Sequence, residues 1–146
     1  MNHAVNEILV PVDGSENSVR ATRFALRLAS AMQVGLRLFY VFPAASVELV
    51  GMAGMSRGDI ENAAEAAGER AFEKVRKEIA DPRLEGMERD IALGDPAEEI
   101  IAQTERNAGL LVVIGRRGLS RMKSLLLGSV SDKVIRHAAC PVTVVT

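Results

Sequence analysis

Hydrophobic residues along the chain follow two different spacings, which predicts strands that alternate with helices. Short, almost continuous apolar runs are typical of strands buried on both faces. Such runs occupy residues 8–12, 36–41, 110–114 and 141–145. Between the first two runs, Ala21, Ala25, Leu28 and Met32 recur every three or four positions, the spacing of a helix with one buried face. This alternation continues to the end of the chain, so we expect a parallel α/β sheet with right-handed crossovers and helices on both faces.

The charge on each predicted strand indicates its place in the sheet. Another strand, the third along the chain, is expected at 87–93; it carries three consecutive charged residues and should lie at an edge. The first and fourth strands, 8–12 and 110–114, are apolar and should be central. This ranking fits an open five-stranded sheet with the order 3-2-1-4-5. The order reverses direction between strands 1 and 4, and ligands of open α/β sheets bind beyond the carboxyl ends of strands at such a reversal. We therefore expect a site at residues 13–15 and 115–118.

Cap and turn residues predict where the other helices begin and end. A second helix follows the spacing of residues 60–75 and should end at 81–82. Before the third helix, Asp95 is expected to cap the first turn and Glu98 to complete a capping box with it. The residues expected to share one face of the last helix are Leu126, Val130 and Val134.

Residues 43–58, PAASVELVGMAGMSRG, show no helical or strand spacing and are expected to form a long irregular loop. Loops of this length in small domains are often lids, so one hypothesis is that the segment closes over a bound ligand. Simple disorder is the alternative.

Composition narrows the class of protein. The 146 residues are 48% hydrophobic, with 18 basic and 19 acidic side chains and a net charge of -1. This favours one folded domain spanning 1–146 and gives no indication of a nucleic-acid or membrane partner. The charge is nevertheless uneven, because residues 115–137 hold six basic side chains against one acidic.

The small number of cysteines and histidines argues against a disulfide framework and against a cysteine-histidine metal site. Cys140 is the single cysteine and precedes a predicted strand, so we expect an inert buried thiol and no disulfide. His3 and His137 lie far apart, which argues against a cysteine-histidine metal site. There is no apolar run of about 20 residues, and the start MNHAVNE has no signal-peptide pattern, so we expect a cytoplasmic protein.

From Ile114 the chain reads IGRRGLSRMKSLLLGSVS, with glycines at 115, 118 and 128. Glycines let the backbone turn and let a ligand approach closely, and the N–H groups at a helix start favour an anion. The segment therefore predicts a phosphate site, although glycines that only shape turns are the alternative. It matches neither GxxxxGK[ST] nor GxGxxG.

The spacing of this segment, a glycine, two residues, a glycine, nine residues and then Gly-Ser, resembles the nucleotide-binding motif of the universal stress protein family, in its ATP-binding branch. The segments ILVPVDGSENSVRATRFALRLA, GDPAEEII and LLLGSVSDKVIRHAACPVTVV are also similar to that family. The resemblance covers essentially the whole chain. It implies a Rossmann-like fold of the adenine nucleotide alpha hydrolase type and a homodimer formed through the last strand, 141–146.

The resemblance also implies roles for individual residues. Asp13 would contact a ribose hydroxyl or a Mg²⁺ ion bound with ATP, and Val41 would read adenine through its backbone. The other residues that it places at the nucleotide are Pro11, Val12, Gly115, Gly118, Gly128, Ser129, Val130 and Ser131. One departure is that Ala108 and Gly109 precede the fourth strand, where the family often has an acidic residue.

Several candidate residues have simpler interpretations. Arg116 and Arg117 could reach phosphate oxygens or be ordinary solvated charges, and Asp13 could simply start the turn at Gly14. His137 lies too close along one helix to its polar neighbours for a catalytic triad. The first functional hypothesis is a homodimeric, ATP-binding regulator or sensor in the stress response. The alternatives are a slow ATPase or a protein that modifies itself, for instance at Ser129, and a nucleotide-independent dimeric adaptor.

Overall fold

The computed structural model describes residues 4–118 and 126–146 and contains one parallel five-stranded sheet with the order β3-β2-β1-β4-β5. This confirms the predicted fold class and strand order. The strands are β1 Glu7–Pro11, β2 Gly35–Pro43, β3 Glu88–Gly94, β4 Leu110–Gly115 and β5 Val142–Val145. The helices are α1 Glu16–Met32, α2 Ala44–Met52, α3 Arg57–Ile79, α4 Pro96–Arg106 and α5 Ser129–His137, with a 3₁₀ turn at Pro82–Leu84.

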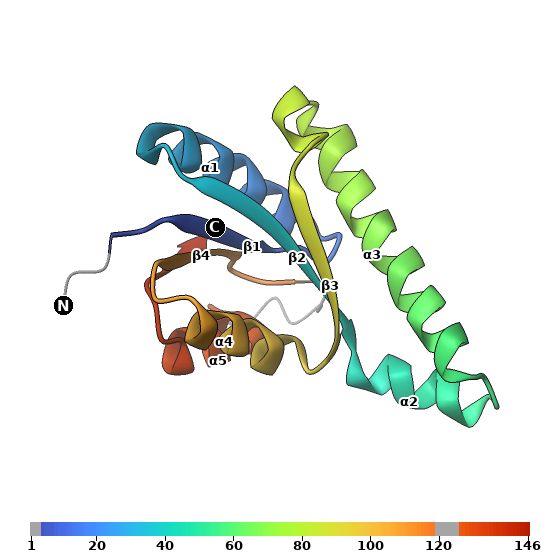
Figure 1. Cartoon of the computed structure of the whole chain (residues 1–146). Helices are drawn as coiled ribbons and strands as arrows, with labels where there is room; N and C mark the ends of the chain where they lie inside the picture. The colour runs from blue at the N-terminus through green and yellow to red at the C-terminus, as the bar shows by residue number, and fades with distance from the viewer. Residues whose placement is uncertain (1–3, 119–125) are drawn as a thin grey trace.

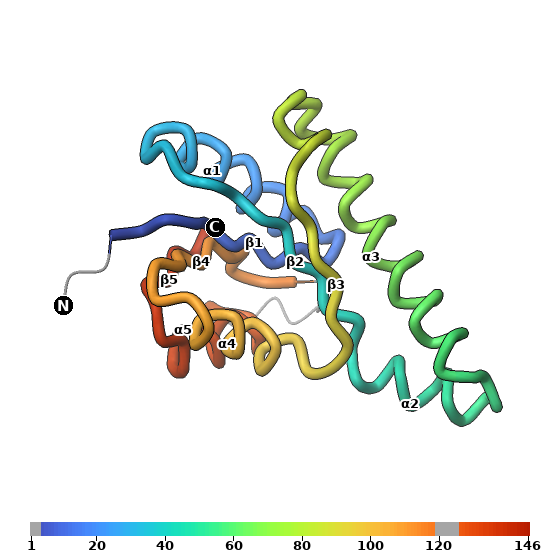
Figure 2. Tube along the Cα trace, viewed as in Figure 1, coloured from blue at the N-terminus to red at the C-terminus, as the bar shows by residue number. Residues whose placement is uncertain are grey.

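Two helices cover each face of the sheet, as Figures 1 and 2 show. On one face α1 and α3 pack against the sheet around Phe72 and Val75, and on the other α4 and α5 pack around Ile100 and Val134. β4 is buried along its whole length, because it lies inside the sheet and under helices on both sides. The charged start of β3 is exposed at the sheet edge, as its sequence predicts.

The segment 43–58 differs from the prediction of an irregular loop. β2 extends to Pro43, α2 occupies Ala44–Met52, and α3 already begins at Arg57. The hydrophobic spacing does not reveal α2, because its apolar residues are spread around the whole helix and none of its residues is buried. It projects from the end of β2 (Figure 1).

Two smaller expectations also change. Asp95 caps α4 by accepting a hydrogen bond from the Glu98 backbone N–H at 3.0 Å, but Glu98 does not complete a capping box. Its carboxylate instead lies 3.2 Å from the Lys133 ammonium of α5. Leu126 does not share a face with Val130, because it precedes the helix and is 77% exposed.

Candidate functional site

A cavity of about 270 Å³ opens at the carboxyl ends of β1, β2 and β4, where the strand order reverses. Every residue predicted for the nucleotide site except Arg116 lines it. These residues are Pro11, Val12, Asp13, Val41, Gly115, Arg117, Gly118, Gly128, Ser129, Val130 and Ser131. The structure thus brings together two segments about a hundred residues apart in the chain.

The turn after β1 is held by its own polar side chains. Asp13 Oδ1 accepts a hydrogen bond from the Ser15 N–H at 2.9 Å, and Ser15 Oγ accepts one from the Ser18 N–H at 3.2 Å, which caps α1. Gly14 lies between them with φ +85°, a conformation that favours glycine. Asp13 therefore does shape the turn. Its second oxygen, Oδ2, lies against Gly118 across the cavity, where a Cβ atom would overlap it.

The two described ends of the glycine loop, residues 115–118 and 126–128, and the start of α5 are joined at the Arg116 carbonyl. This oxygen accepts hydrogen bonds from the Gly128 N–H at 2.8 Å and from Ser131 Oγ at 2.7 Å. The Arg116 N–H donates to Val145 at 2.8 Å, which joins the loop to the end of β5. The sequence groups Arg116 with Arg117 beside the phosphates, but the Arg116 side chain does not line the cavity. Its Nε is buried and has no hydrogen-bond partner within the described residues.

The start of α5 carries no side-chain cap within residues 4–118 and 126–146. Gly128 occupies the N-cap position and contributes no side-chain hydrogen bond, and the same holds for Pro43 at the start of α2. By contrast, Ser15, Ser56 and Asp95 cap α1, α3 and α4. The first N–H groups of a helix need acceptors, and the helix dipole adds partial positive charge there. Since Ser129 lies at this start and lines the cavity, the arrangement is suited to an anion such as a phosphate.

The other side of the cavity is apolar. Ser15, which the strand order placed at the site, lines the cavity as well. The lining residues that the sequence did not assign to the site are Ser18, Phe39, Tyr40, Pro43, Pro96, Ile100 and Ile114. Pro96 and Ile100 are one helical turn apart on α4, within the GDPAEEII segment, which could have indicated them. Burial raises the pKa of the Tyr40 phenol, and the nearby charge of Arg70 opposes this shift. An apolar wall opposite an anion site suits a ligand with a flat ring at one end and phosphate at the other.

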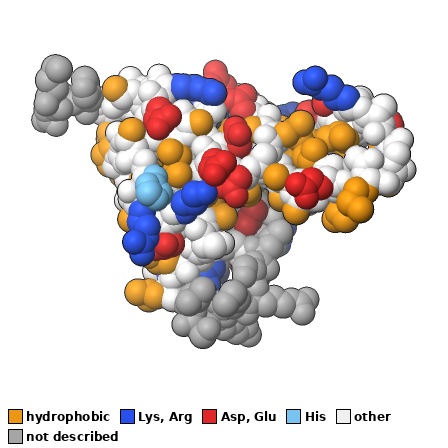
Figure 3. All heavy atoms as spheres, turned by 90° about the horizontal axis from the view of Figure 1, so that it is seen from below, with side chains coloured by type: hydrophobic (Ala, Val, Ile, Leu, Met, Phe, Trp, Pro, Cys, Tyr) orange, Lys and Arg blue, Asp and Glu red, His pale blue; other side chains and the backbone are white. Residues whose placement is uncertain are grey.

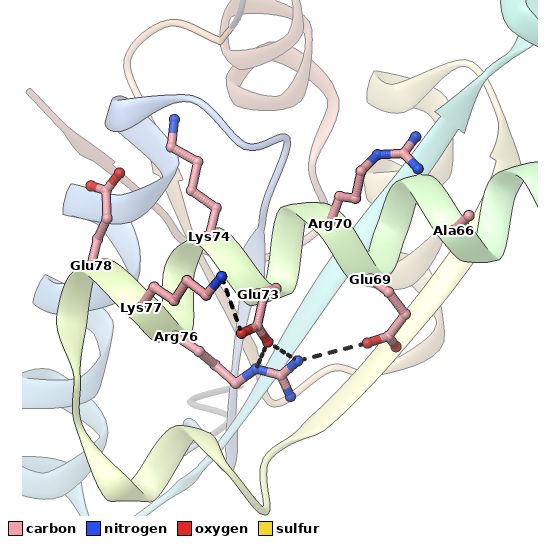
Figure 4. A pocket seen from close by; sticks show the side chains of 8 residues that line it. All are labelled: Ala66, Glu69, Arg70, Glu73, Lys74, Arg76, Lys77 and Glu78. Atoms are coloured by element: carbon pink, nitrogen blue, oxygen red, sulfur yellow. Dashed lines mark hydrogen bonds and ion pairs between the residues drawn. The ribbon is translucent and has the colours of Figure 1, made fainter.

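A wider hollow of about 670 Å³ lies along α3 and is less suited to a ligand (Figure 4). Four of its charged side chains, Glu69, Glu73, Arg76 and Lys77, already pair with one another. Arg76 Nη2 lies 2.6 Å from Glu73 and 3.8 Å from Glu69, and Lys77 Nζ lies 3.9 Å from Glu73. We therefore treat the cavity at the strand ends as the candidate site.

The rest of the described surface gives few further signals. Figure 3 shows acidic and basic side chains mixed on the face seen from below. Within the described residues no three His, Cys, Asp or Glu side chains gather as a metal site, and no helix is long and apolar enough to cross a membrane. Cys140 is partly buried, and this burial raises the pKa of its thiol, consistent with an unreactive cysteine.

Comparisons with known proteins agree with this fold. The model of the universal stress protein family matches residues 5–146. The universal stress protein YxiE of Bacillus subtilis is 32% identical over 146 aligned positions, which cover 96% of this chain and 98% of that protein. The universal stress protein UspA from Lactobacillus plantarum has a similar solved structure, with a TM-score of 0.78 and 24% identity, covering 99% of this chain and 100% of the other.

Two more distant structures contain nucleotides. One is a universal stress protein in complex with cAMP, with a TM-score of 0.62 over 97% of both chains. The other is the universal stress protein from Archaeoglobus fulgidus in complex with dAMP, with a TM-score of 0.58 over 99% of this chain and 100% of that one. Both are 22% identical to this chain, so the likeness is one of fold.

Proposed function

Since the chain belongs to the universal stress protein family, we propose that it binds an adenine nucleotide, ATP above all, in the cavity at the carboxyl ends of β1 and β4. The observation that carries this proposal is the start of α5, which lines the cavity and has no side-chain cap among the residues that the structure describes. Structural neighbours with cAMP and dAMP add support for an adenine nucleotide.

The proposed binding mode places each part of ATP against a different part of the cavity. The phosphates would lie against Gly115, Gly118 and the first turn of α5, with Arg117 beside them. Adenine would lie against the apolar wall near Val41, and the ribose near Asp13. Asp13 would also be the carboxylate next to any Mg²⁺ bound with ATP, whose other ligands would be phosphate oxygens and water.

Binding, rather than fast catalysis, is the role that these residues support. Orientation and charge around a phosphate provide affinity, but hydrolysis also needs a group that activates water. Among the described residues that line the cavity, Asp13 is the one carboxylate, and one of its oxygens already accepts a hydrogen bond from the Ser15 N–H. We therefore propose a cytoplasmic, nucleotide-dependent regulator or sensor in the stress response.

A charge placed at the start of α5 tests the proposal. Ser129→Asp puts a carboxylate beside the proposed phosphates, and Ser129→Asn is the uncharged variant of nearly the same shape. An acidic residue in the first turn stabilises a helix by about 0.3–1 kcal/mol, so Ser129→Asp should keep or raise the melting temperature. In isothermal titration calorimetry with ATP and Mg²⁺, we expect Ser129→Asp to lose at least about tenfold in affinity, equal to 1.4 kcal/mol, and Ser129→Asn to lose much less.

No saturable binding by the native protein at millimolar nucleotide would refute the proposal. Intact-mass measurement after incubation with ATP addresses the alternative that the protein modifies itself at Ser129. An added phosphoryl or adenylyl group that disappears in Ser129→Asn would favour that alternative.

We further propose a homodimer formed through the last strand, 141–146. β5 is an edge strand and its residues Val142–Val145 are all partly exposed. A regular, apolar edge is a template for pairing with a second chain. Thr143→Lys should lower the mass measured by light scattering to that of a monomer. Glu88→Lys, on the opposite edge strand β3, is the matched control and should leave the mass unchanged.

A further inference from the structure

Lys74 of α3 makes a long-range contact with the turn after β1. Its Nζ donates a hydrogen bond of 2.6 Å to the carbonyl oxygen of Gly14, 60 residues earlier in the chain. Figure 4 shows the Lys74 side chain extending away from the group formed by Glu69, Glu73 and Arg76. Lys74 is therefore directed toward the candidate site, although it does not line the cavity.

The turn that Lys74 contacts is open on one side. A Cβ atom on Gly14 would meet no heavy atom within 4 Å, so on that side no packed neighbour fixes the glycine and hydrogen bonds matter more. Asp13 and Ser15 supply one of these bonds from inside the turn, and Lys74 supplies another from α3. A hydrogen bond from an ammonium group is charge-assisted and stronger than a neutral one.

We propose that Lys74 is a positioning residue of the nucleotide site. It holds the Gly14 carbonyl from the α3 side, so that the Asp13 carboxylate keeps its orientation toward Gly118 and the ligand on the other side of the turn. This inference rests on the proposed function, because positioning of Asp13 matters for affinity only if a nucleotide binds there. Lys74 acts through the turn and not by contact with the nucleotide.

A double-mutant cycle separates this role from a direct effect of charge. We expect Lys74→Met, which removes the ammonium group and keeps most of the side-chain length, to weaken ATP binding about tenfold. Lys74→Arg keeps the positive charge and should retain most of the affinity. Lys77→Met is the matched control. It removes a cation three residues further along α3, where the ammonium lies beside Glu73, and it should leave the affinity unchanged. In an Asp13→Asn background, Lys74→Met should cause little further loss, because the group that it positions has been altered.

Hydrogen exchange of the Ser15 amide gives a readout that needs no nucleotide. Lys74→Met should speed this exchange, because the Asp13–Ser15 bond opens more often, and Lys77→Met should not. Unchanged Ser15 exchange, or an undiminished effect of Lys74→Met in the Asp13→Asn background, would overturn the positioning role. A different result would refute the proposed function. If the native protein binds no adenine nucleotide but Lys74→Met still speeds Ser15 exchange, then Lys74 orders the turn after β1 and has no effect on nucleotide affinity.

Discussion

Gly115→Ala should destabilise the protein because the end of β4 has no room for a methyl group. A Cβ atom at this buried position would lie 2.9 Å from the carbonyl carbon, the carbonyl oxygen and the Cβ of Asn17, in the first turn of α1. Two of these atoms belong to the backbone, so α1 or β4 must shift as a unit. Overpacking of this kind costs about 1–3 kcal/mol. For a chain of this size, each kcal/mol lowers the melting temperature by about 2–4 °C.

Thermal and urea denaturation measure this effect, with Gly35→Ala as the matched control. Gly35 begins β2, is exposed, and would have no atom within 4 Å of an added Cβ. Its substitution should change the free energy of unfolding by no more than about 0.5 kcal/mol. A Gly115→Ala protein that melts at the same temperature as Gly35→Ala would refute the argument that Asn17 and β4 are in rigid contact.

Three further predictions concern polar side chains. Ser131→Ala removes a buried hydroxyl that donates to the Arg116 and Gly128 carbonyls, so the free energy of unfolding in urea should fall by about 1–3 kcal/mol. Ser56→Ala breaks the capping box with Asp59 and should cost about 0.5–2 kcal/mol without changing nucleotide affinity. The Arg83 guanidinium lowers the pKa of Asp81 from 3.8 to about 2, so the stability from this pair is present above pH 4 and is lost as the pH falls through 2. Arg83→Met should return the Asp81 midpoint toward its ordinary value in a carboxyl NMR titration, and an unchanged midpoint would contradict this cause.

The sequence predicted the sheet well because its signals are local. A strand buried on both faces must be apolar along its length, and only a strand at an edge tolerates three successive charges, as β3 does. Strand order and helix placement follow from these two constraints and from the handedness of crossovers. α2 was missed because a helix that buries no face has no reason to show a 3.6-residue spacing.

The site was only partly predictable for a related reason. Residues directly after β1 and β4 could be assigned, because strand ends and glycines mark them in the sequence. Pro96 and Ile100 reach the cavity from α4, and their apolar character alone cannot distinguish a cavity wall from the core. The absence of Arg116 from the lining could not be anticipated either, since adjacent arginines in a loop point in directions that only the folded backbone decides.

The parallel pairing of β1 with β4 has a consequence for the way the protein is made. Glu7 pairs with Leu110, about a hundred residues further along, and this pairing helps to place the turn after β1 beside the start of α5. Contacts of such high sequence separation form slowly, because the entropy of closing a long loop is lost before the contacts contribute any stabilising free energy. During synthesis, the part of the cavity formed by residues after β1 and β2 therefore stays incomplete until the last fifth of the chain has left the ribosome. A nascent chain without α5 would offer no complete pocket, so ligand affinity should appear abruptly near the end of translation.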